Sequence, residues 1–502
     1  MSTSSTTSTT SSTSASESSS NKVILGKRSH TETIEKGESN NGQMHSRNRY
    51  RNNPPDFAVL AFKYSSFYPY VKYTKEGKPY IDFKNPEAVR ELTYCLLRND
   101  FNLILEIPLD SLCPPIPNRL NYIHWIEDLI TISETRQDRT IYGIDIGTGA
   151  SCIYPLLACT LNKNWVMLAT EIDEKSVEYA ENNVLRNNLE SKISVVLNKT
   201  DKKILLSEEV MINNNIRFAF CMCNPPFYES QEQYEKGVEI KQTPSLSVCN
   251  GTSREKFTPG GEFQFIKDIL DESLVLRNKI RWYTSMIGRL ETVNKIVREL
   301  KRTGIDNYVV TEFCQGQTRR WGIGWSFGSQ RPSTSIINQT SKKLRKISQP
   351  KTEFRFGIPA DSHDVIGCIL VHLNELDIDG NFNDENGTFF GSAKTNTWSR
   401  AARRQRMKSS ECQKESKELS SSSSTSATSV TTTASTTTAT DESTVFETLF
   451  EFTLRLEPWK SNATNTKVTF SWTNGKDRNV FESFYSHVKK WMEQKFAAND
   501  NE

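Results

Sequence analysis

The chain has 502 residues, of which 36% are hydrophobic and 25% charged, and its formal net charge is +3. This length allows roughly two or three domains with sizeable cores. The small net charge excludes nucleic-acid binding through bulk charge, so such binding would depend on local basic clusters. The first residues lack the pattern of a secretory signal, and no apolar run is long enough to span a bilayer, so we expect no membrane association.

The ten cysteines lie mostly in apolar segments and lack the spacing of a disulfide framework. Cys221 and Cys223 form a C-x-C pair, but no second pair and no nearby histidine would complete a zinc site. We therefore expect reduced thiols in an intracellular protein, and no metal site.

The N-terminal residues 1–43 are rich in serine and threonine, then mixed polar, and are predicted to be disordered. Arginines then alternate with other residues at Arg47, Arg49 and Arg51. This pattern is typical of a solvated, charged arm. It also suits an arm that lays guanidinium groups on RNA phosphates, with Tyr50 available for stacking, and we favour this second interpretation.

Two helices are predicted next. The first begins at Asn85-Pro86-Glu87, where proline occupies the first turn, and the second covers residues 120–130. Arg119 lies at the start of the second helix. It is either a surface charge or a side chain that reaches a carboxylate.

Residues 140–150 are predicted to form a strand and a glycine-rich turn, followed by a helix over residues 151–159. Gly147 and Gly149 let the backbone turn tightly and approach a ligand closely. A second strand, residues 165–171, ends at Glu171. An acid at this place can accept hydrogen bonds from both ribose hydroxyls of a nucleoside cofactor.

This strand–turn–helix–strand order is typical of the first half of a doubly wound sheet, which binds either a dinucleotide or S-adenosylmethionine. Cys152 stands where the dinucleotide fingerprint has its third glycine, and Asp145 precedes the turn. Both residues favour S-adenosylmethionine.

A third strand covers residues 193–197, and a fourth ends in Asn224-Pro225-Pro226-Phe227. Proline cannot donate to a sheet, and the first proline restricts Asn224 to an extended conformation. The Asn224 side-chain carbonyl and a proline carbonyl can each accept one N–H of an exocyclic amino group, while Phe227 stacks on the ring. Alternatively, the motif is only a strand-terminating turn.

Ligands of doubly wound sheets bind at the carboxyl ends of the strands, beside the topological switch point. The glycine turn, Glu171 and the Asn-Pro-Pro-Phe turn are therefore expected to face one crevice. A polar loop over residues 230–257 would lie beside it and act as a lid. Further strands are predicted at residues 282–287, 308–313 and 318–327. Arg319 and Arg320 form either a charge pair at the sheet edge or a second RNA contact, and we favour RNA.

The C-terminal third begins with a basic linker, residues 331–352, whose cluster at 342–346 is a candidate nuclear signal. A serine/threonine tract at 412–441 interrupts the remainder. Around this tract the patterns predict strands at 366–373, 446–456 and 467–472, a basic helix at 398–408 and an amphipathic helix at 480–496. We expect one small α+β domain formed by residues 353–411 and 442–497.

Several segments together resemble the methyltransferase-like family that modifies U6 small nuclear RNA. The resemblance runs through most of residues 44–330 and includes the arginine arm, the segment 83–90, the helix start at Arg119, the glycine turn and the Asn-Pro-Pro-Phe motif. It implies a Rossmann-like class I methyltransferase sheet with a smaller split C-terminal domain. It also implies an enzyme that uses S-adenosylmethionine to methylate the N6 of adenosine in U6 RNA and in structured messenger-RNA hairpins. We expect this enzyme in the nucleus alone or in both the nucleus and the cytoplasm.

The resemblance carries the family's cofactor contacts over to Arg119, Gly147, Glu171 and Asn224. A further contact falls at Thr200, in a loop that is longer here. Of the family's RNA-binding arginines near the last strand Arg320 is present, whereas Gln317 replaces another.

The catalytic motif implied by the resemblance is Asn224, Pro225, Pro226 and Phe227. No strong base lies in it, so catalysis would come mostly from positioning the amino nitrogen for a direct in-line methyl transfer.

Other interpretations remain open at this level. A ribosomal RNA adenine methyltransferase has a similar core, but would not require the arginine arm and C-terminal domain. A protein-glutamine methyltransferase also uses Asn-Pro-Pro, usually followed by tyrosine. The protein could also be an RNA-binding scaffold with dispensable catalysis. The C-terminal region resembles the family's vertebrate-conserved region, which implies extra affinity for U6 RNA, but it also fits a protein-interaction module.

Overall fold

The structure is a computed structural model of the whole chain. It describes residues 43–131, 139–199, 216–239, 251–316, 318–333, 350–383, 385–402, 448–459 and 462–497, together with positions 336, 344, 347 and 404.

The larger part is built on a seven-stranded sheet with the order β5-β4-β3-β6-β7-β9-β8. Five neighbouring strands are parallel, and β9 and β8 complete the sheet antiparallel to their neighbours. This is the predicted Rossmann-like arrangement. The strands are β3 (Ile141–Ile146), β4 (Trp165–Glu171), β5 (Ile193–Leu197), β6 (Phe218–Cys223), β7 (Ile280–Ile287), β8 (Tyr308–Gln315) and β9 (Thr318–Trp325).

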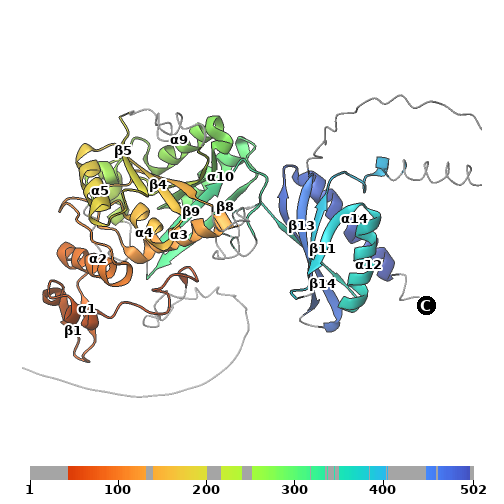
Figure 1. Cartoon of the computed structure of the whole chain (residues 1–502), viewed down its shortest axis with the longest axis horizontal. Helices are drawn as coiled ribbons and strands as arrows, with labels where there is room; N and C mark the ends of the chain where they lie inside the picture. The colour runs from red at the N-terminus through yellow and green to blue at the C-terminus, as the bar shows by residue number, and fades with distance from the viewer. Residues whose placement is uncertain are drawn as a thin grey trace, which may run out of the picture. The chain divides into compact units, whose positions relative to one another are not determined.

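Helices cover both faces of this sheet, as Figure 1 shows for α3 and α4 on one side and α9 and α10 on the other. Phe220 and Met222 of β6 belong to the first apolar core, whereas Cys221 and Cys223 belong to the second, because alternate side chains of a strand point to opposite faces. The helices are α2 (Pro86–Phe101), α3 (Ile116–Thr131), α4 (Ile153–Leu161), α5 (Glu174–Arg186), α7 (Gln231–Glu239), α8 (Ser253–Lys256), α9 (Gly261–Leu276) and α10 (Leu290–Arg302).

The helix α3 begins earlier than its predicted start at residue 120. Proline at position 117 is well suited to the first turn of a helix, and the added turn buries Arg119 inside it.

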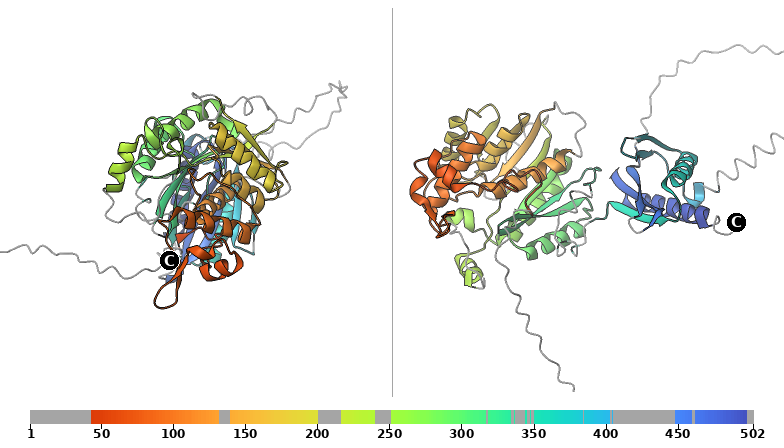
Figure 2. Two further views of the ribbon diagram at one scale, coloured as in Figure 1. Left: turned by 90° about the vertical axis from the view of Figure 1, so that its left-hand side faces the viewer. Right: turned by 90° about the horizontal axis from the view of Figure 1, so that it is seen from below.

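A small N-terminal lobe precedes α2 and is drawn in red in Figure 2. It contains α1 (Phe57–Lys63), the 3-10 turn η2 (Tyr68–Tyr70) and a hairpin of β1 (Val71–Tyr73) and β2 (Pro79–Ile81). The Asp56 carboxylate caps α1 by accepting the N–H groups of Ala58 and Val59.

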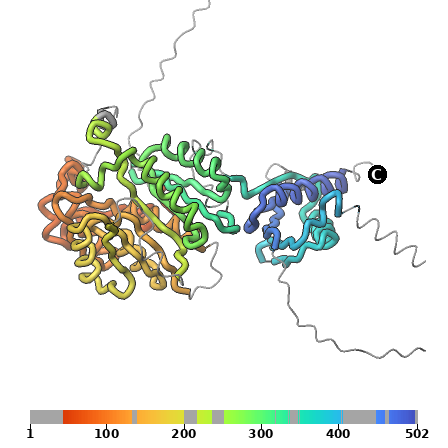
Figure 3. The backbone as a smooth tube through the Cα atoms, turned by 90° about the horizontal axis from the view of Figure 1, so that it is seen from above, coloured from red at the N-terminus to blue at the C-terminus, as the bar shows by residue number. Residues whose placement is uncertain are grey.

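The C-terminal sheet has the order β10-β14-β13-β12-β11 and is antiparallel throughout. Its strands come from both sides of residues 405–447 in the sequence. Figure 3 traces this region in cyan to blue. Its elements are β10 (Glu353–Ile358), α12 (Ser362–Glu375), β11 (Ile378–Asn383), β12 (Thr388–Ala393), β13 (Phe450–Trp459), β14 (Asn462–Gly475) and α14 (Arg478–Ala497).

The prediction of a strand at residues 366–373 is wrong, because this segment lies in the helix α12. The Asp361 side chain accepts the N–H of His363 and caps the helix. Val365, Ile369 and Leu373, spaced four residues apart, then form its buried face. A continuous apolar run does not distinguish a strand from a buried helix.

The predicted polar loop at residues 230–257 also differs from the structure, since it contains α7 and α8. Glutamine, glutamate and lysine are good helix formers, and the Thr252–Glu255 capping box stabilises the start of α8.

The predicted basic helix at 398–408 is described only in part. Trp398 is buried in the C-terminal core, and residues 400–402 are helical.

Candidate active site

The predicted site motifs meet at the carboxyl edge of the parallel strands. β3 lies between β4 and β6, with Ile146 paired to Thr170 on one side and to Cys223 on the other. The glycine turn that follows β3 is therefore flanked by Glu171 and Asn224. Gly147 and Gly149 both have positive φ angles, of 66° and 65°, which favour glycine.

The Glu171 carboxylate organises the turn. One oxygen accepts the N–H of Gly149 at 2.8 Å, and the other accepts the N–H groups of Ile172 and Asp173 at 2.8 and 3.1 Å. Burial raises the pKa of Glu171, while these backbone hydrogen bonds oppose the shift. Glu171 thus holds the backbone in place where a ligand would lie.

Arg119 lies in the first turn of α3 and is buried. Its Nη1 donates to the Tyr154 hydroxyl at 3.1 Å, and its guanidinium lies 5.2 Å from the centroid of the Tyr154 ring. Burial raises the pKa of Asp145 to about 7, although the Arg119 charge acts in the opposite direction. An arginine and an aspartate are thus both buried beside the glycine turn.

Several polar atoms around the glycine turn and the end of β6 are buried without a hydrogen-bond partner among the described residues. They include both Asp145 carboxylate oxygens, the Thr148 hydroxyl, the Arg119 Nε and the Asn224 Oδ1. A buried polar group without a partner is costly, so such a cluster is typical of a site completed by a ligand. A positively charged amino-acid-like ligand with N–H, hydroxyl and carboxylate groups, such as S-adenosylmethionine, fits these atoms.

The buried Asp145 predicts a pH-dependent stability. The unfolded chain releases this proton near pH 3.8, whereas the folded chain retains it to about pH 7. Between these values the folded state binds more protons, so the free energy of unfolding falls as pH rises. Relative to Asp145→Asn, we expect wild type to lose about 2 to 4 kcal/mol between pH 4 and pH 8.

Denaturant unfolding of both proteins at several pH values, without added ligand, checks this prediction. Asp110→Asn is the matched control, because Asp110 is exposed beside Lys175. A stability difference between wild type and Asp145→Asn that does not change with pH would contradict the prediction.

Two residues that the sequence analysis did not identify form hydrogen bonds with the end of β6, just before Asn224. The Tyr122 hydroxyl accepts the N–H of Cys223 at 3.3 Å and lies 2.8 Å from the Thr284 hydroxyl. The Thr284 hydroxyl in turn donates to the Cys221 carbonyl at 2.8 Å. Tyr122 is one turn of α3 beyond Arg119, and this spacing was the available signal.

The Phe227 ring is partly buried, and the Arg320 guanidinium lies 5.1 Å from its centroid. β9 therefore brings one predicted RNA-binding arginine to the predicted catalytic motif. Arg319, next to it, instead forms an ion pair with Glu312 at 3.1 Å and is about half exposed.

The predicted RNA-binding arm packs along α2 and α3. Arg47 contacts Asp128 and Glu127, and Arg49 contacts Asp100, with both arginine side chains 47% exposed. These ion pairs hold the two guanidinium groups at the surface, where they remain accessible to a ligand.

Two neighbours complete the arm. Arg51 is partly exposed in a turn. The expectation that Tyr50 is available for stacking is wrong, because it is 3% exposed and its hydroxyl donates to Asp100.

Two positions named in the sequence analysis, Thr200 and Gln317, lie outside the described residues, as does most of the basic cluster at 342–346.

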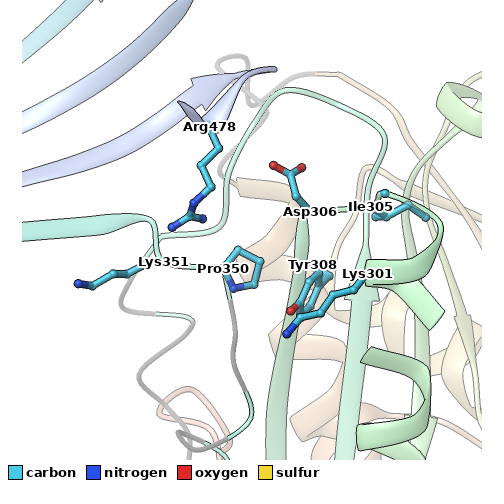
Figure 4. A pocket seen from close by; sticks show the side chains of 8 residues that line it. Lys301, Ile305, Asp306, Tyr308, Pro350, Lys351 and Arg478 are labelled. Atoms are coloured by element: carbon cyan, nitrogen blue, oxygen red, sulfur yellow. The ribbon is translucent and has the colours of Figure 1, made fainter. Parts of the chain in front are cut away.

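A cavity of about 560 Å³ contains none of the predicted site residues (Figure 4). It is lined by Lys301, Gly304, Ile305, Asp306, Tyr308, Pro350, Lys351 and Arg478.

In the part of the chain that the structure describes, no helix is long and apolar enough to span a membrane, and no group of three or more His, Cys, Asp or Glu side chains could hold a metal ion. The eight cysteines in that part are free thiols.

Comparisons with known proteins agree with this geometry. A family model described as RNA methyltransferase matches residues 38–329. The human RNA N(6)-adenosine-methyltransferase METTL16 is 44% identical over 320 residues, which cover 63% of this chain and 56% of the human protein. The U6 small nuclear RNA (adenine-(43)-N(6))-methyltransferase of Schizosaccharomyces pombe is 39% identical over 66% of this chain and 83% of its own length.

A solved structure is also similar. The hMettl16 catalytic domain in complex with MAT2A 3′UTR hairpin 1 is 46% identical, with a TM-score of 0.52, over 57% of this chain and 95% of that one. The chain thus spans little more than half the length of the human relative, but nearly all of the crystallised catalytic domain.

Proposed function

Because the chain belongs to the RNA methyltransferase family, we propose that it transfers a methyl group from S-adenosylmethionine to the N6 nitrogen of an adenosine. We propose U6 small nuclear RNA and structured messenger-RNA hairpins as its substrates. The relatives named above support this choice, since one acts on U6 RNA and the other was crystallised with a messenger-RNA hairpin.

The observation that carries the proposal is the buried, unpartnered Asn224 Oδ1 at the end of β6, next to the glycine turn. A hydrogen-bond acceptor at this position could bind an N–H of an amino group and orient its nitrogen toward the methyl donor. The partly buried Phe227 ring, three residues later, suits a planar base.

The chain's own residues would act by positioning. S-adenosylmethionine supplies an electrophilic methyl group, and Arg119, Gly147, Glu171 and Asp145 are the residues that would hold it. Asn224 Oδ1 and the Pro225 carbonyl would accept the two N–H bonds of the adenine amino group. These two acceptors orient the nitrogen lone pair and stabilise the positive charge that develops on the nitrogen during transfer.

Methyl transfer from labelled S-adenosylmethionine to a panel of purified RNAs tests the proposal. We expect label on an adenosine of U6 RNA and on a structured messenger-RNA hairpin. Label on ribosomal RNA alone would contradict the proposed substrates but not the proposed reaction. No label on any RNA would contradict the whole proposal.

We also propose that the protein acts in the nucleus. The basic cluster at 342–346 and the choice of U6 RNA support this location. Microscopy of the tagged chain, with and without neutral residues at those lysines and the arginine, tests it; a cytoplasmic wild-type chain would contradict it.

A further inference from the structure

The Phe227 ring lies directly against the backbone of Gly288, the residue that follows β7. A Cβ atom built on Gly288 would be 2.9 Å from Phe227 Cδ1 and 3.2 Å from Phe227 Cγ. Real side chains essentially never approach so closely, and the neighbour is a ring rather than a flexible chain end. The ring can therefore occupy its position only because residue 288 has no side chain.

Gly288 is itself held by a buried carboxylate. Glu262, in the first turn of α9, is 3% exposed. One of its oxygens accepts the N–H of Gly288 at 2.7 Å, and the other accepts the Thr292 hydroxyl at 2.6 Å. The same Cβ built on Gly288 would also lie 3.2 Å from the Glu262 Oε2. Glu262 thus fixes the backbone on which the ring rests.

The charges around Glu262 connect this contact to Arg320, one of the predicted RNA-binding arginines. Burial raises the pKa of Glu262, while Arg289 and Arg320 oppose the shift. Arg320 also lies over the Phe227 ring, and Arg289 lies 5.2 Å from the centroid of the neighbouring Tyr228 ring. Residues that follow β7 and residues of α9 and β9 therefore converge on the ring that follows β6.

We propose that Gly288 and Glu262 are positioning residues that hold the Phe227 ring at the place where it receives the target base. This inference rests on the proposed function and deepens it. Glu262 fixes Gly288, and the bare Cα of Gly288 sets how far the ring can sit toward β7. A displaced ring would leave the base misaligned relative to Asn224, while the glycine turn at the end of β3 would be unaffected.

The first test is Gly288→Ala in the full-length chain. We expect kcat for RNA methylation to fall about 100-fold, which is the cost of an ångström-scale misplacement. The dissociation constants for S-adenosylmethionine and for RNA should stay within about twofold of wild type, since the atoms nearest to a Cβ on Gly288 belong to Phe227 and Glu262. Gly367→Ala is the matched control, because a Cβ there meets no atom within 4 Å.

A double-mutant cycle separates positioning from general damage. If Gly288→Ala acts through the ring, it should cost much less activity and thermal stability in a Phe227→Ala background than in wild type. The ring contact is then gone, and only the 3.2 Å contact of the new Cβ with Glu262 Oε2 remains. Additive losses in both quantities would overturn the proposal, as would a wild-type kcat for Gly288→Ala. This cycle also covers the case in which Gly288→Ala alone fails to fold, because the double variant should then fold again.

Two substitutions of Glu262 provide an independent test of the proposal. Glu262→Gln retains an oxygen that can accept the Gly288 N–H, so it should keep kcat within about tenfold of wild type, whereas Glu262→Ala should approach Gly288→Ala. Equal losses in both Glu262 variants would contradict the positioning role. If wild type methylated no RNA, the proposed function would fail, yet the thermal-stability cycle of Gly288 and Phe227 would still test the contact.

Discussion

Replacing Asn224 by alanine should lower kcat for RNA methylation by about 100- to 1,000-fold, the usual cost of removing one preorganised polar contact from a transition state. The loss should fall on kcat rather than on RNA affinity, because in the proposed mechanism the Asn224 oxygen accepts from the reacting amino group, whereas the arginine arm packs along α2 and α3. Single-turnover kinetics and RNA binding measured on the same preparations check this split.

Asn294→Ala is the control for this experiment, because Asn294 is exposed on α10 and its side chain donates to the Leu290 carbonyl of its own helix. An Asn224→Ala protein with the wild-type rate would refute the assigned role. A cell that tolerates Asn224→Ala but not deletion of the gene would instead indicate that the protein acts as a scaffold.

Replacing Phe450 by alanine should destabilise the C-terminal domain by about 3 to 5 kcal/mol, the usual cost of removing a fully buried phenylalanine. Phe450 is 0% exposed, and its ring centroid lies 5.6 Å from that of Trp398, 5.3 Å from Phe481 and 5.1 Å from Phe484. Trp398 precedes residues 405–447 and Phe450 follows them. The variant therefore tests whether the two segments fold as one unit.

Denaturant unfolding of the full chain, followed by circular dichroism and tryptophan fluorescence, should show the C-terminal transition moving to lower denaturant concentration. Phe390→Ala on β12 is the matched control, because Phe390 is 49% exposed and its replacement should lower the free energy of unfolding far less. Equal shifts for Phe390→Ala and Phe450→Ala would mean that the two segments do not share a core.

The elements that bound the active site were predictable because each has a strong local signal. The strand at 165–171 was predicted with the bounds that β4 has, and the strand at 193–197 with those of β5. Apolar runs that end at glycine, an acid or proline stop abruptly, so strand ends are well defined in this sequence. These ends carry Gly147, Glu171 and Asn224, and so the candidate site followed from them.

The helix α12 shows where local signals fail. Its apolar positions fit a strand and a helix equally well, and only the Asp361 cap and the packing of Val365, Ile369 and Leu373 against the sheet decide for a helix. The prediction that Tyr50 is exposed was wrong for a related reason. Its neighbours in the sequence are basic and polar, which suggested a surface position, whereas Asp100, which accepts its hydroxyl, is 50 residues away.

The sequence by itself determined the sheet, the order of the motifs and the residue types that would hold a cofactor and an amino group. These properties depend on periodicity, turn chemistry and spacing, which are local. Only the tertiary structure decided that Gly288 carries the Phe227 ring, that Glu262 holds Gly288, and that Tyr122 braces the end of β6. Each of these contacts joins residues at least 26 positions apart, and the contact of Gly288 with Phe227 also depends on a missing side chain. A linear pattern records neither property.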